Sequence, residues 1–362
     1  MNPAQQLHAA GQSLWLDSIN RRMLNTGTLA RYISEIAVTG LTSNPTILGH
    51  AMAASADYDD TLRAKVAEGI RDPEQLVYAA ALEDLTAAAD LFAPTWNSTG
   101  GVDGYVSLEV PPGLAYDAET SIETAKRLHA QAKQRNLLVK IPGTPAGLTA
   151  MESLVADGVG INVTLLFSDT QYLQTAEAYM RALERRQSAG QPLDVPSVAS
   201  VFISRWDRAA DPLLPVELHG RLGLAMAQKV YASYRSLLAD DRWKALAAAG
   251  ARPQRVLWAS TSTKDPTFPD TYYVGHLAAP DTIDTLPEKT LVAYAEHGGP
   301  IELMKADYAD AETCIAEIAT AGVDIDALGQ NLQNQGARAF EADWGSLLEA
   351  IDVKAGALVS VA

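Results

Sequence analysis

The stretch NLLVKIPG at residues 136–143 holds the pattern that decides the fold. Successive side chains of an extended strand point to opposite faces, so this run splits into two rows. One row is apolar and consists of Leu137, Val139 and Ile141. Lys140 lies in the other row, where a charged amine is costly to bury unless it is paired or has a function.

Three further runs split in the same way, each with one apolar row. The opposite rows carry polar side chains: Asp17 in 13–17, Glu109 in 104–110, and Asn162 and Thr164 in 158–164. An open sheet covered by helices on both faces needs two apolar rows, whereas a closed barrel can use its inward row for an active site. The alternation therefore favours a barrel.

Eight apolar runs alternate with helical stretches along most of the chain, which is typical of βα units. The strands are expected at 13–17, 36–40, 104–110, 136–141, 158–164, 197–202, 255–260 and 281–286. Helical periodicity marks 119–135, 145–156, 169–186 and 220–249, and two helical segments are expected between 45 and 103. The pattern predicts an α/β fold: one (β/α)8 TIM barrel domain over 1–362, with helical insertions and a helical C-terminal extension over about 330–362.

Composition excludes several classes of protein. The 362 residues are 48% hydrophobic, which is ordinary for a globular chain, and their net charge of −16 would repel nucleic acid. No apolar stretch reaches the roughly 18 residues of a membrane span, and no secretion signal begins the chain. With the single cysteine Cys314, this predicts a cytoplasmic protein. The six histidines are scattered, so no metal site is expected.

The polar residues of the inward rows lie near the C-terminal ends of their strands, where barrels of this class hold their active sites. They are Asp17, Glu109, Lys140, Asn162 and Thr164, with Ser200 and Arg205 around the end of the sixth strand. Burial disfavours the charged form of a lysine, and a neutral amine can attack a carbonyl carbon. Glu109 and Asp17 can move the protons of such a reaction, or they are ion partners of Lys140 or Arg205.

Three segments at the strand ends can hold the rest of a substrate. The guanidinium of Arg205 suits a phosphate, although a salt bridge with Asp207 or Asp211 explains it equally well. The run 259–266 (ASTSTKDP) offers Ser260 and Lys264 after the seventh strand, where barrels often bind phosphate. In TSNP at 42–45, Asn44 suits a helix cap, and its amide can also reach substrate hydroxyls.

Two long motifs carry a resemblance to a known family. GLTSNPTIL at 40–48 and LLVKIPGTPAGLTAMESL at 137–154 resemble the Asn-Pro and active-site lysine signatures of the transaldolases, which form a Schiff base. The similarity continues through LWLDS at 14–18, SLEVPP at 107–112 and INVTLLFS at 161–168.

The resemblance implies transfer of a dihydroxyacetone unit between sugar phosphates, in the non-oxidative pentose phosphate pathway, without a cofactor or metal. Small-molecule sugar phosphates would be the partners, and the enzyme would be a monomer or homodimer. By this resemblance Lys140 would form the imine, Asp17 would act on the C4 hydroxyl, and Glu109 with Thr164 would handle a catalytic water. Asn44 and Asn162 would hold the dihydroxyacetone unit, and Ser200 would bind substrate hydroxyls. Arg205 would bind the phosphate, with Ser260 and Lys264 beside it.

Two departures from the family pattern concern the phosphate end. Many members carry an arginine after the seventh strand where this chain has STSTK at 260–264, and several have Ser-Pro-Phe where it has Ser200-Val201-Phe202. Two alternatives stay open: a fructose-6-phosphate-type aldolase that releases free dihydroxyacetone, and a non-catalytic barrel that binds sugar phosphates.

Overall fold

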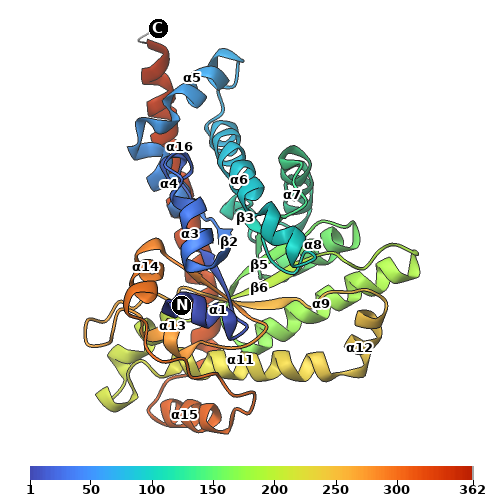
Figure 1. The fold of residues 1–362 in the computed structure, drawn as a ribbon, viewed down its shortest axis with the longest axis vertical. Helices are drawn as coiled ribbons and strands as arrows, with labels where there is room; N and C mark the ends of the chain where they lie inside the picture. Colours follow the sequence, from blue (N-terminus) through green and yellow to red (C-terminus); the bar gives the residue numbers. More distant parts are fainter. Residues whose placement is uncertain (361–362) are drawn as a thin grey trace.

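The computed structural model describes residues 1–360, so the last two residues of the predicted extension lie outside the described part (Figure 1). Eight parallel strands close into one barrel in chain order, which confirms the predicted (β/α)8 fold. The strands are β1 (Ser13–Leu16), β2 (Val38–Thr42), β3 (Val106–Glu109), β4 (Leu137–Pro142), β5 (Ile161–Leu166), β6 (Ser197–Phe202), β7 (Arg255–Ala259) and β8 (Ile283–Leu286).

The helices surround the barrel and extend beyond it. They are α1 (Pro3–Ala9), α2 (Arg21–Asn25), α3 (Thr28–Ile36), α4 (Pro45–Ala54), α5 (Asp59–Ala67), α6 (Pro73–Ser98), α7 (Ala118–Ala132), α8 (Pro145–Ala156), α9 (Asp169–Ser188), α10 (Ser204–Ala210), α11 (Leu222–Ala239), α12 (Asp241–Ala248), α13 (Tyr272–His276), α14 (Glu288–His297), α15 (Ala309–Thr320) and α16 (Ile325–Ser360). Within the described residues, no helix is both long and apolar enough to span a membrane.

Two predicted boundaries are wrong for local reasons. The second strand was expected over 36–40, but α3 continues to Ile36 and Ala37 ends it with φ 55 in the left-handed region, so β2 runs two residues further. The connection between 45 and 103 holds three α-helices instead of two. Ser55 is extended and caps a short 3-10 turn, which separates α4 from α5.

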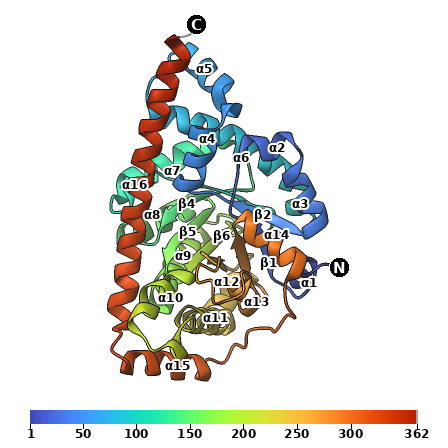
Figure 2. The same cartoon turned by 90° about the vertical axis from the view of Figure 1, so that its left-hand side faces the viewer.

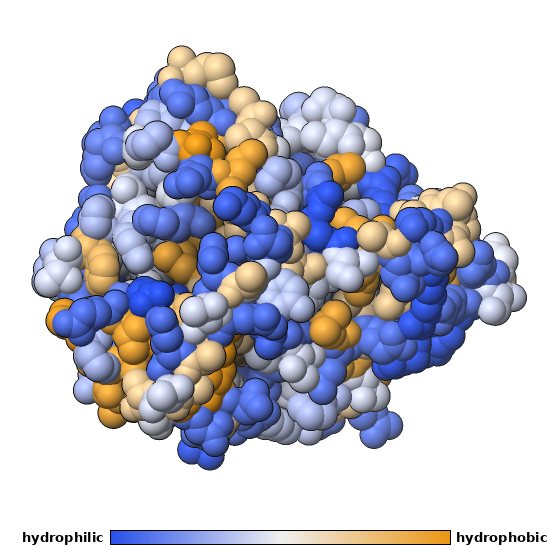
Figure 3. All heavy atoms as spheres, turned by 90° about the horizontal axis from the view of Figure 1, so that it is seen from below, coloured by the Kyte–Doolittle hydropathy of each residue, from blue (hydrophilic) through white to orange (hydrophobic). Residues whose placement is uncertain are grey.

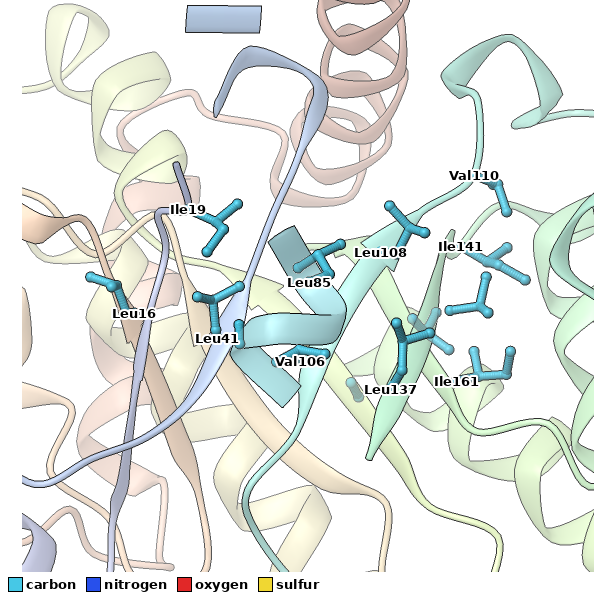
Figure 4. Packing of buried hydrophobic residues seen from close by; sticks show 14 of the residues in the cluster. Leu16, Ile19, Leu41, Leu85, Val106, Leu108, Val110, Leu137, Ile141 and Ile161 are labelled. Carbon is cyan, nitrogen blue, oxygen red and sulfur yellow. The ribbon is translucent and has the colours of Figure 1, made fainter. Parts of the chain in front are cut away.

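The two rows of each strand pack into separate cores, as the alternation predicts. The outward row faces the helices, and Figure 4 shows its members: Leu16, Leu41, Val106, Leu108, Leu137, Ile141 and Ile161 among others. The inward row packs inside the barrel and includes Trp15, Tyr105, Leu138 and Leu257. Leu165 also lies in this inner core, because β5 changes register between Val163 and Leu166.

The C-terminal helix α16 forms a long brace along one side of the molecule. Figure 2 shows it running from α15 to the tip at α5, and it packs against α4, α5 and α6. The Lys354 ammonium ties its far end to the Asp59 carboxylate, with an Nζ to Oδ1 distance of 2.9 Å. Seen from below Figure 1, the surface is mostly hydrophilic with separate small apolar patches (Figure 3).

The N-terminal end of the barrel is closed by a buried polar group, the basal cluster: Ser13, Trp15, Asp103 and Arg255. Asp103 accepts hydrogen bonds from the Ser13 hydroxyl and, at 2.8 Å, from the Trp15 indole. Arg255 donates to Ser13 at 2.7 Å and lies 3.8 Å from the Asp103 carboxylate. Both Asp103 oxygens are therefore occupied, as buried polar groups require.

Candidate active site

The centre of the site is an ion pair between neighbouring strands. Register pairs Glu109 of β3 with Lys140 of β4, and Lys140 with Asn162 of β5. Lys140 Nζ lies 3.1 Å from Glu109 Oε2 and donates at 3.1 Å to the carbonyl of Ser43. Lys140 is 5% exposed and Glu109 is 4% exposed, so the pair is shielded from bulk water.

Glu109 keeps unused acceptor capacity. Apart from its ion pair with Lys140, neither carboxylate oxygen has a hydrogen-bond partner among the described residues, and the buried Thr164 hydroxyl also lacks one. Burial raises the pKa of Glu109, and the nearby Lys140 ammonium offsets part of this increase. A carboxyl group with a raised pKa holds a proton more readily than an ordinary glutamate does, which suits an acid-base role.

Asp17 stands at the end of β1, at the same mouth. Its Oδ1 accepts a hydrogen bond of 2.6 Å from the Thr42 hydroxyl, and Thr42 is 2.7 Å from the Thr285 hydroxyl. Burial raises the pKa of Asp17, while the Lys140 charge and the Thr42 hydrogen bond lower it. The site thus holds two carboxyl groups at the ends of separate strands, and the charge of Lys140 lowers the pKa of both.

A chain of hydrogen bonds orients the amide of Asn162. Its Nδ2 donates to the Ser107 hydroxyl at 3.1 Å, and its Oδ1 accepts from the Ser200 hydroxyl at 2.7 Å. Asn162 and Ser200 are both buried. These contacts fix the side chains of three strands at the level of Lys140.

Asn44 caps α4 from the rim. Its Oδ1 accepts from the backbone N–H of Ile47 at 3.0 Å, and Pro45 is the first helical residue, which confirms the predicted cap. The side chain is half-buried, and its amide nitrogen makes no hydrogen bond within the described residues. Capping therefore leaves the donor end of Asn44 available to a ligand.

Arg205 lies on α10, after β6, without a carboxylate partner in the described chain. Its guanidinium stacks over Phe202 at 4.9 Å and over Phe340 of α16 at 5.8 Å from the ring centres. Burial lowers its pKa. The alternative of a salt bridge is wrong. Asp207 accepts from Tyr273 and a backbone N–H, and Asp211 accepts from a backbone N–H.

The two residues predicted after β7 differ in position. The Ser260 hydroxyl is 3.0 Å from the Ser204 hydroxyl at the start of α10, so Ser260 lies next to the Arg205 segment. Lys264 is exposed in the following loop, and its ammonium makes no hydrogen bond or ion pair within the described part of the chain. The structure therefore brings Ser260 to the mouth but gives Lys264 no contact with it.

Five residues of the site had no role assigned from the sequence: Thr42, Ser43, Ser107, Gln333 and Phe340. Ser107 has the inward parity of Glu109, and Thr42 was lost with the misplaced end of β2. In α16, Gln333 carries no local signal, whereas Phe340 is an apolar side chain that suits either a C-terminal segment covering the mouth or packing in the core. Gln333 donates at 3.0 Å to the carbonyls of Gly143 and Leu165, and the Phe340 ring centre lies 5.9 Å from Lys140 Nζ.

Other kinds of site were sought in the same structure. The described residues include no group of three or more histidine, cysteine, aspartate or glutamate side chains placed to hold a metal ion. A cavity of about 900 Å³ lies outside the barrel wall between α11, α13 and α15, and none of the residues around Lys140 lines it. A buried amine, two carboxyl groups and an unpaired arginine at one mouth fit a substrate with a carbonyl at one end and an anionic group at the other.

Comparisons with known proteins agree with this chemistry. Residues 14–351 match the family described as Transaldolase/Fructose-6-phosphate aldolase. A protein named transaldolase from Frankia alni is 43% identical over 98% of this chain and 98% of its own length. Transaldolases from Acidothermus cellulolyticus and Thiobacillus denitrificans are each 42% identical to this chain over 97% of its length. The matched region covers 96% of the first protein and 100% of the second.

Proposed function

The chain belongs to the transaldolase/fructose-6-phosphate aldolase family, and on that premise we propose that it transfers a dihydroxyacetone unit from a ketose phosphate to an aldose phosphate. The donor is sedoheptulose 7-phosphate or fructose 6-phosphate, and the acceptor is glyceraldehyde 3-phosphate or erythrose 4-phosphate. The observation that carries the proposal is the buried pair of Lys140 and Glu109, 3.1 Å apart at the C-terminal end of the barrel.

The first stage forms an imine on Lys140. Once the Lys140 ammonium has given a proton to Glu109, the neutral amine attacks the C2 carbonyl of the ketose phosphate, and the resulting carbinolamine loses water. Glu109 accepts the proton that Lys140 gives up and returns one to the departing hydroxyl. Its raised pKa supports this exchange, and the unpartnered oxygens of Glu109 and the free Thr164 hydroxyl offer hydrogen bonds to the water that leaves.

The second stage breaks the bond between C3 and C4. Asp17 takes the proton of the C4 hydroxyl, the C4 oxygen becomes a carbonyl, and the bonding electrons move through C3 to the imine nitrogen. The aldose phosphate leaves and an enamine stays on Lys140. C3 of the enamine then attacks the aldehyde carbon of a second aldose phosphate, which reverses the cleavage. Water hydrolyses the new imine and releases the new ketose phosphate from Lys140. Because the first product leaves before the second substrate binds, the kinetics are ping-pong.

The remaining residues hold the two ends of the substrate. Asn44 and Asn162 bind the dihydroxyacetone unit, Ser200 binds substrate hydroxyls, and Arg205 binds the phosphate. Support for the last role is that Arg205 has no carboxylate partner in the described chain and faces the mouth between two aromatic rings. Ser260 and Lys264 are proposed as secondary contacts to the phosphate.

We also propose the setting of this reaction. The enzyme works in the cytoplasm, in the non-oxidative pentose phosphate pathway, as a monomer or homodimer, with sugar phosphates as its only partners. The chemistry needs no cofactor, because the lysine itself supplies the electron sink once the imine forms.

A coupled assay tests the function. Fructose 6-phosphate is supplied with and without erythrose 4-phosphate, and glyceraldehyde 3-phosphate and free dihydroxyacetone are both measured. A transaldolase forms glyceraldehyde 3-phosphate continuously only when the acceptor is present. Continuous release of dihydroxyacetone without an acceptor would identify an aldolase. If neither product forms with the wild type, and sugar phosphate binding survives in Lys140→Ala, the protein is a non-catalytic binding barrel.

A further inference from the structure

A second cavity lies at the opposite end of the barrel from Lys140. It measures about 500 Å³ and is bordered by segments that precede β3, β4, β5, β6 and β7, together with the ends of α6, α7 and α9. Because segments that lead into parallel strands all meet at the N-terminal end of a barrel, this cavity is separated from the mouth by the length of the strands. It shares no residue with the proposed active site.

Cationic side chains dominate the lining of this N-terminal cavity. They are Lys133, Arg135, Arg186 and Arg252, against the single carboxylate of Asp194. None of the four cations forms an ion pair within the part of the chain that the structure describes. The chain has 44 acidic and only 28 basic residues, so a gathering of four unpaired cations runs against its overall charge.

Arg186 is the most constrained of the four. It is only 9% exposed, and its guanidinium donates to the carbonyls of Pro192 at 2.7 Å and Ala156 at 2.9 Å. The two carbonyls orient the group but do not neutralise it. Burying a charge without a counterion is unfavourable, and an anion in the cavity would supply the missing partner.

Helix ends explain only part of the cluster. Cations near a helix C-terminus are stabilised by the helix dipole. This accounts for Arg186, which lies in the last turn of α9 and donates to the last carbonyl of α8, and for Lys133 after α7. Arg252 belongs to no helix, and Arg135 lies three residues beyond the end of α7. Their convergence on one cavity therefore needs a different cause.

We propose that the N-terminal cavity binds a small organic phosphate or diphosphate. Arginine guanidinium groups match phosphate oxygens through paired hydrogen bonds, and the cavity has the volume of a small-ligand site. Trp96 and Tyr105 line the same cavity and provide an apolar wall for the organic part of the ligand. The site is independent of the transfer reaction, because no catalytic group lies in it.

The probe for this site is inorganic pyrophosphate, titrated by calorimetry at low ionic strength. Arg205→Ala removes the phosphate ligand of the mouth, and Arg135→Ala/Arg252→Ala removes two ligands of the N-terminal cavity. Arg63→Ala/Lys244→Ala removes two exposed cations elsewhere and controls for net charge. Thermal melting of each variant establishes that it is folded, and Arg252→Lys is a second, milder variant.

We expect Arg205→Ala and the charge control to keep one pyrophosphate site. The Arg135/Arg252 variant should lose about tenfold or more in affinity at that site, because two charge-assisted contacts disappear. Arg252→Lys should bind with intermediate affinity, and kcat/KM of the transfer reaction should stay within about twofold of the wild type in both cavity variants. Unchanged affinity in the Arg135/Arg252 variant, or complete loss of binding in Arg205→Ala, would overturn the proposal.

Discussion

At the N-terminal end of the barrel both oxygens of Asp103 accept hydrogen bonds, whereas at the C-terminal end the Glu109 carboxylate has no partner within the described residues apart from its ion pair with Lys140. Both carboxylates are buried and each lies near one cation, Arg255 or Lys140. The Asp103 carboxylate is fully engaged by its neighbours, which stabilises the fold. Glu109 and the Thr164 hydroxyl at the same end of the barrel keep free hydrogen-bonding capacity, which a substrate or water can use.

The contrast teaches that a buried ion pair alone does not mark an active site. What distinguishes the mouth is a reactive amine beside acceptors that the fold leaves unused. We therefore expect substitutions at the mouth to lower activity and substitutions in the basal cluster to lower stability.

Replacing Lys140 by alanine should lower kcat/KM by about 10⁴-fold or more, because the imine cannot form without the amine. The coupled assay with fructose 6-phosphate and erythrose 4-phosphate measures this. Lys244→Ala, which removes an exposed lysine, is the matched control and should leave the rate unchanged. Substantial activity in folded Lys140→Ala would remove Lys140 from the mechanism.

Asp17→Asn should lower kcat by about 10²- to 10⁴-fold, since it removes the base that takes the C4 proton while keeping the contact with Thr42. Imine formation should survive, so the variant should still be trapped by borohydride. The raised pKa of Asp17 also predicts that activity of the wild type falls, as the pH is lowered, at a higher pH than an ordinary aspartate would give. An Asp17→Asn variant with normal turnover would contradict this role.

Asp103→Ala should lower the free energy of unfolding by about 3–5 kcal/mol, because it leaves Arg255 buried without its partner. Denaturant unfolding measures the effect, and Asp60→Ala at an exposed position is the control. The kcat of the folded fraction should be close to that of the wild type. A large loss of kcat with unchanged stability would reverse the comparison between the two ends.

Asp284 tests whether an unpartnered buried carboxyl group must be catalytic. It lies on β8, on the face opposite the inward Thr285, and neither oxygen has a hydrogen-bond partner in the described residues. Burial raises its pKa from 3.8 to about 8. Between about pH 4 and pH 8 the unfolded chain ionises this group while the folded protein keeps it protonated, so stability falls as the pH rises, by at most about 1.4 kcal/mol per pH unit.

Asp284→Asn should remove that decline and raise the free energy of unfolding at pH 7 by roughly a few kcal/mol, with activity unchanged. Urea unfolding at pH 5, 7 and 9 measures the slope in both proteins. Loss of activity in the folded variant, or the same slope as in the wild type, would show that Asp284 has a different role.

Phe340→Ala should increase the release of free dihydroxyacetone about tenfold, because the ring over Lys140 shields the enamine from water. Phe340→Leu keeps an apolar cover and should restore most of the transfer reaction. The ratio of free dihydroxyacetone to transferred product measures the effect. An unchanged ratio in both variants would mean that α16 only supports the barrel.

The sequence predicts the barrel and the core of the site because both follow from strand parity. Period-two alternation identifies the inward row, and parallel strands in register bring Glu109, Lys140 and Asn162 side by side. The alternation fails at Leu165, where a left-handed residue with φ 59 changes the register of β5. No local sequence pattern reveals this irregularity in β5.

Contacts from distant segments could not be decided from the sequence either, where Phe340 suits a cover over the mouth and core packing alike. The position of the Ser43 carbonyl, which accepts a hydrogen bond from Lys140, depends on the backbone path after β2. Phe340 lies over Lys140 although the two residues are 200 positions apart in the chain. The unpaired state of Arg205 was undecided for the same reason. Arg205 has no ion pair among the described residues because Asp207 and Asp211 already accept hydrogen bonds from other groups, namely Tyr273 and backbone N–H groups.

The most direct test of the account is reductive trapping. The wild type, Lys140→Ala and Asp17→Asn are each treated with fructose 6-phosphate and sodium borohydride, digested, and analysed by mass spectrometry. We predict irreversible inactivation of the wild type with a single adduct on Lys140, the same adduct in Asp17→Asn, and none in Lys140→Ala. An adduct on another residue, or no adduct in an active wild-type enzyme, would contradict it.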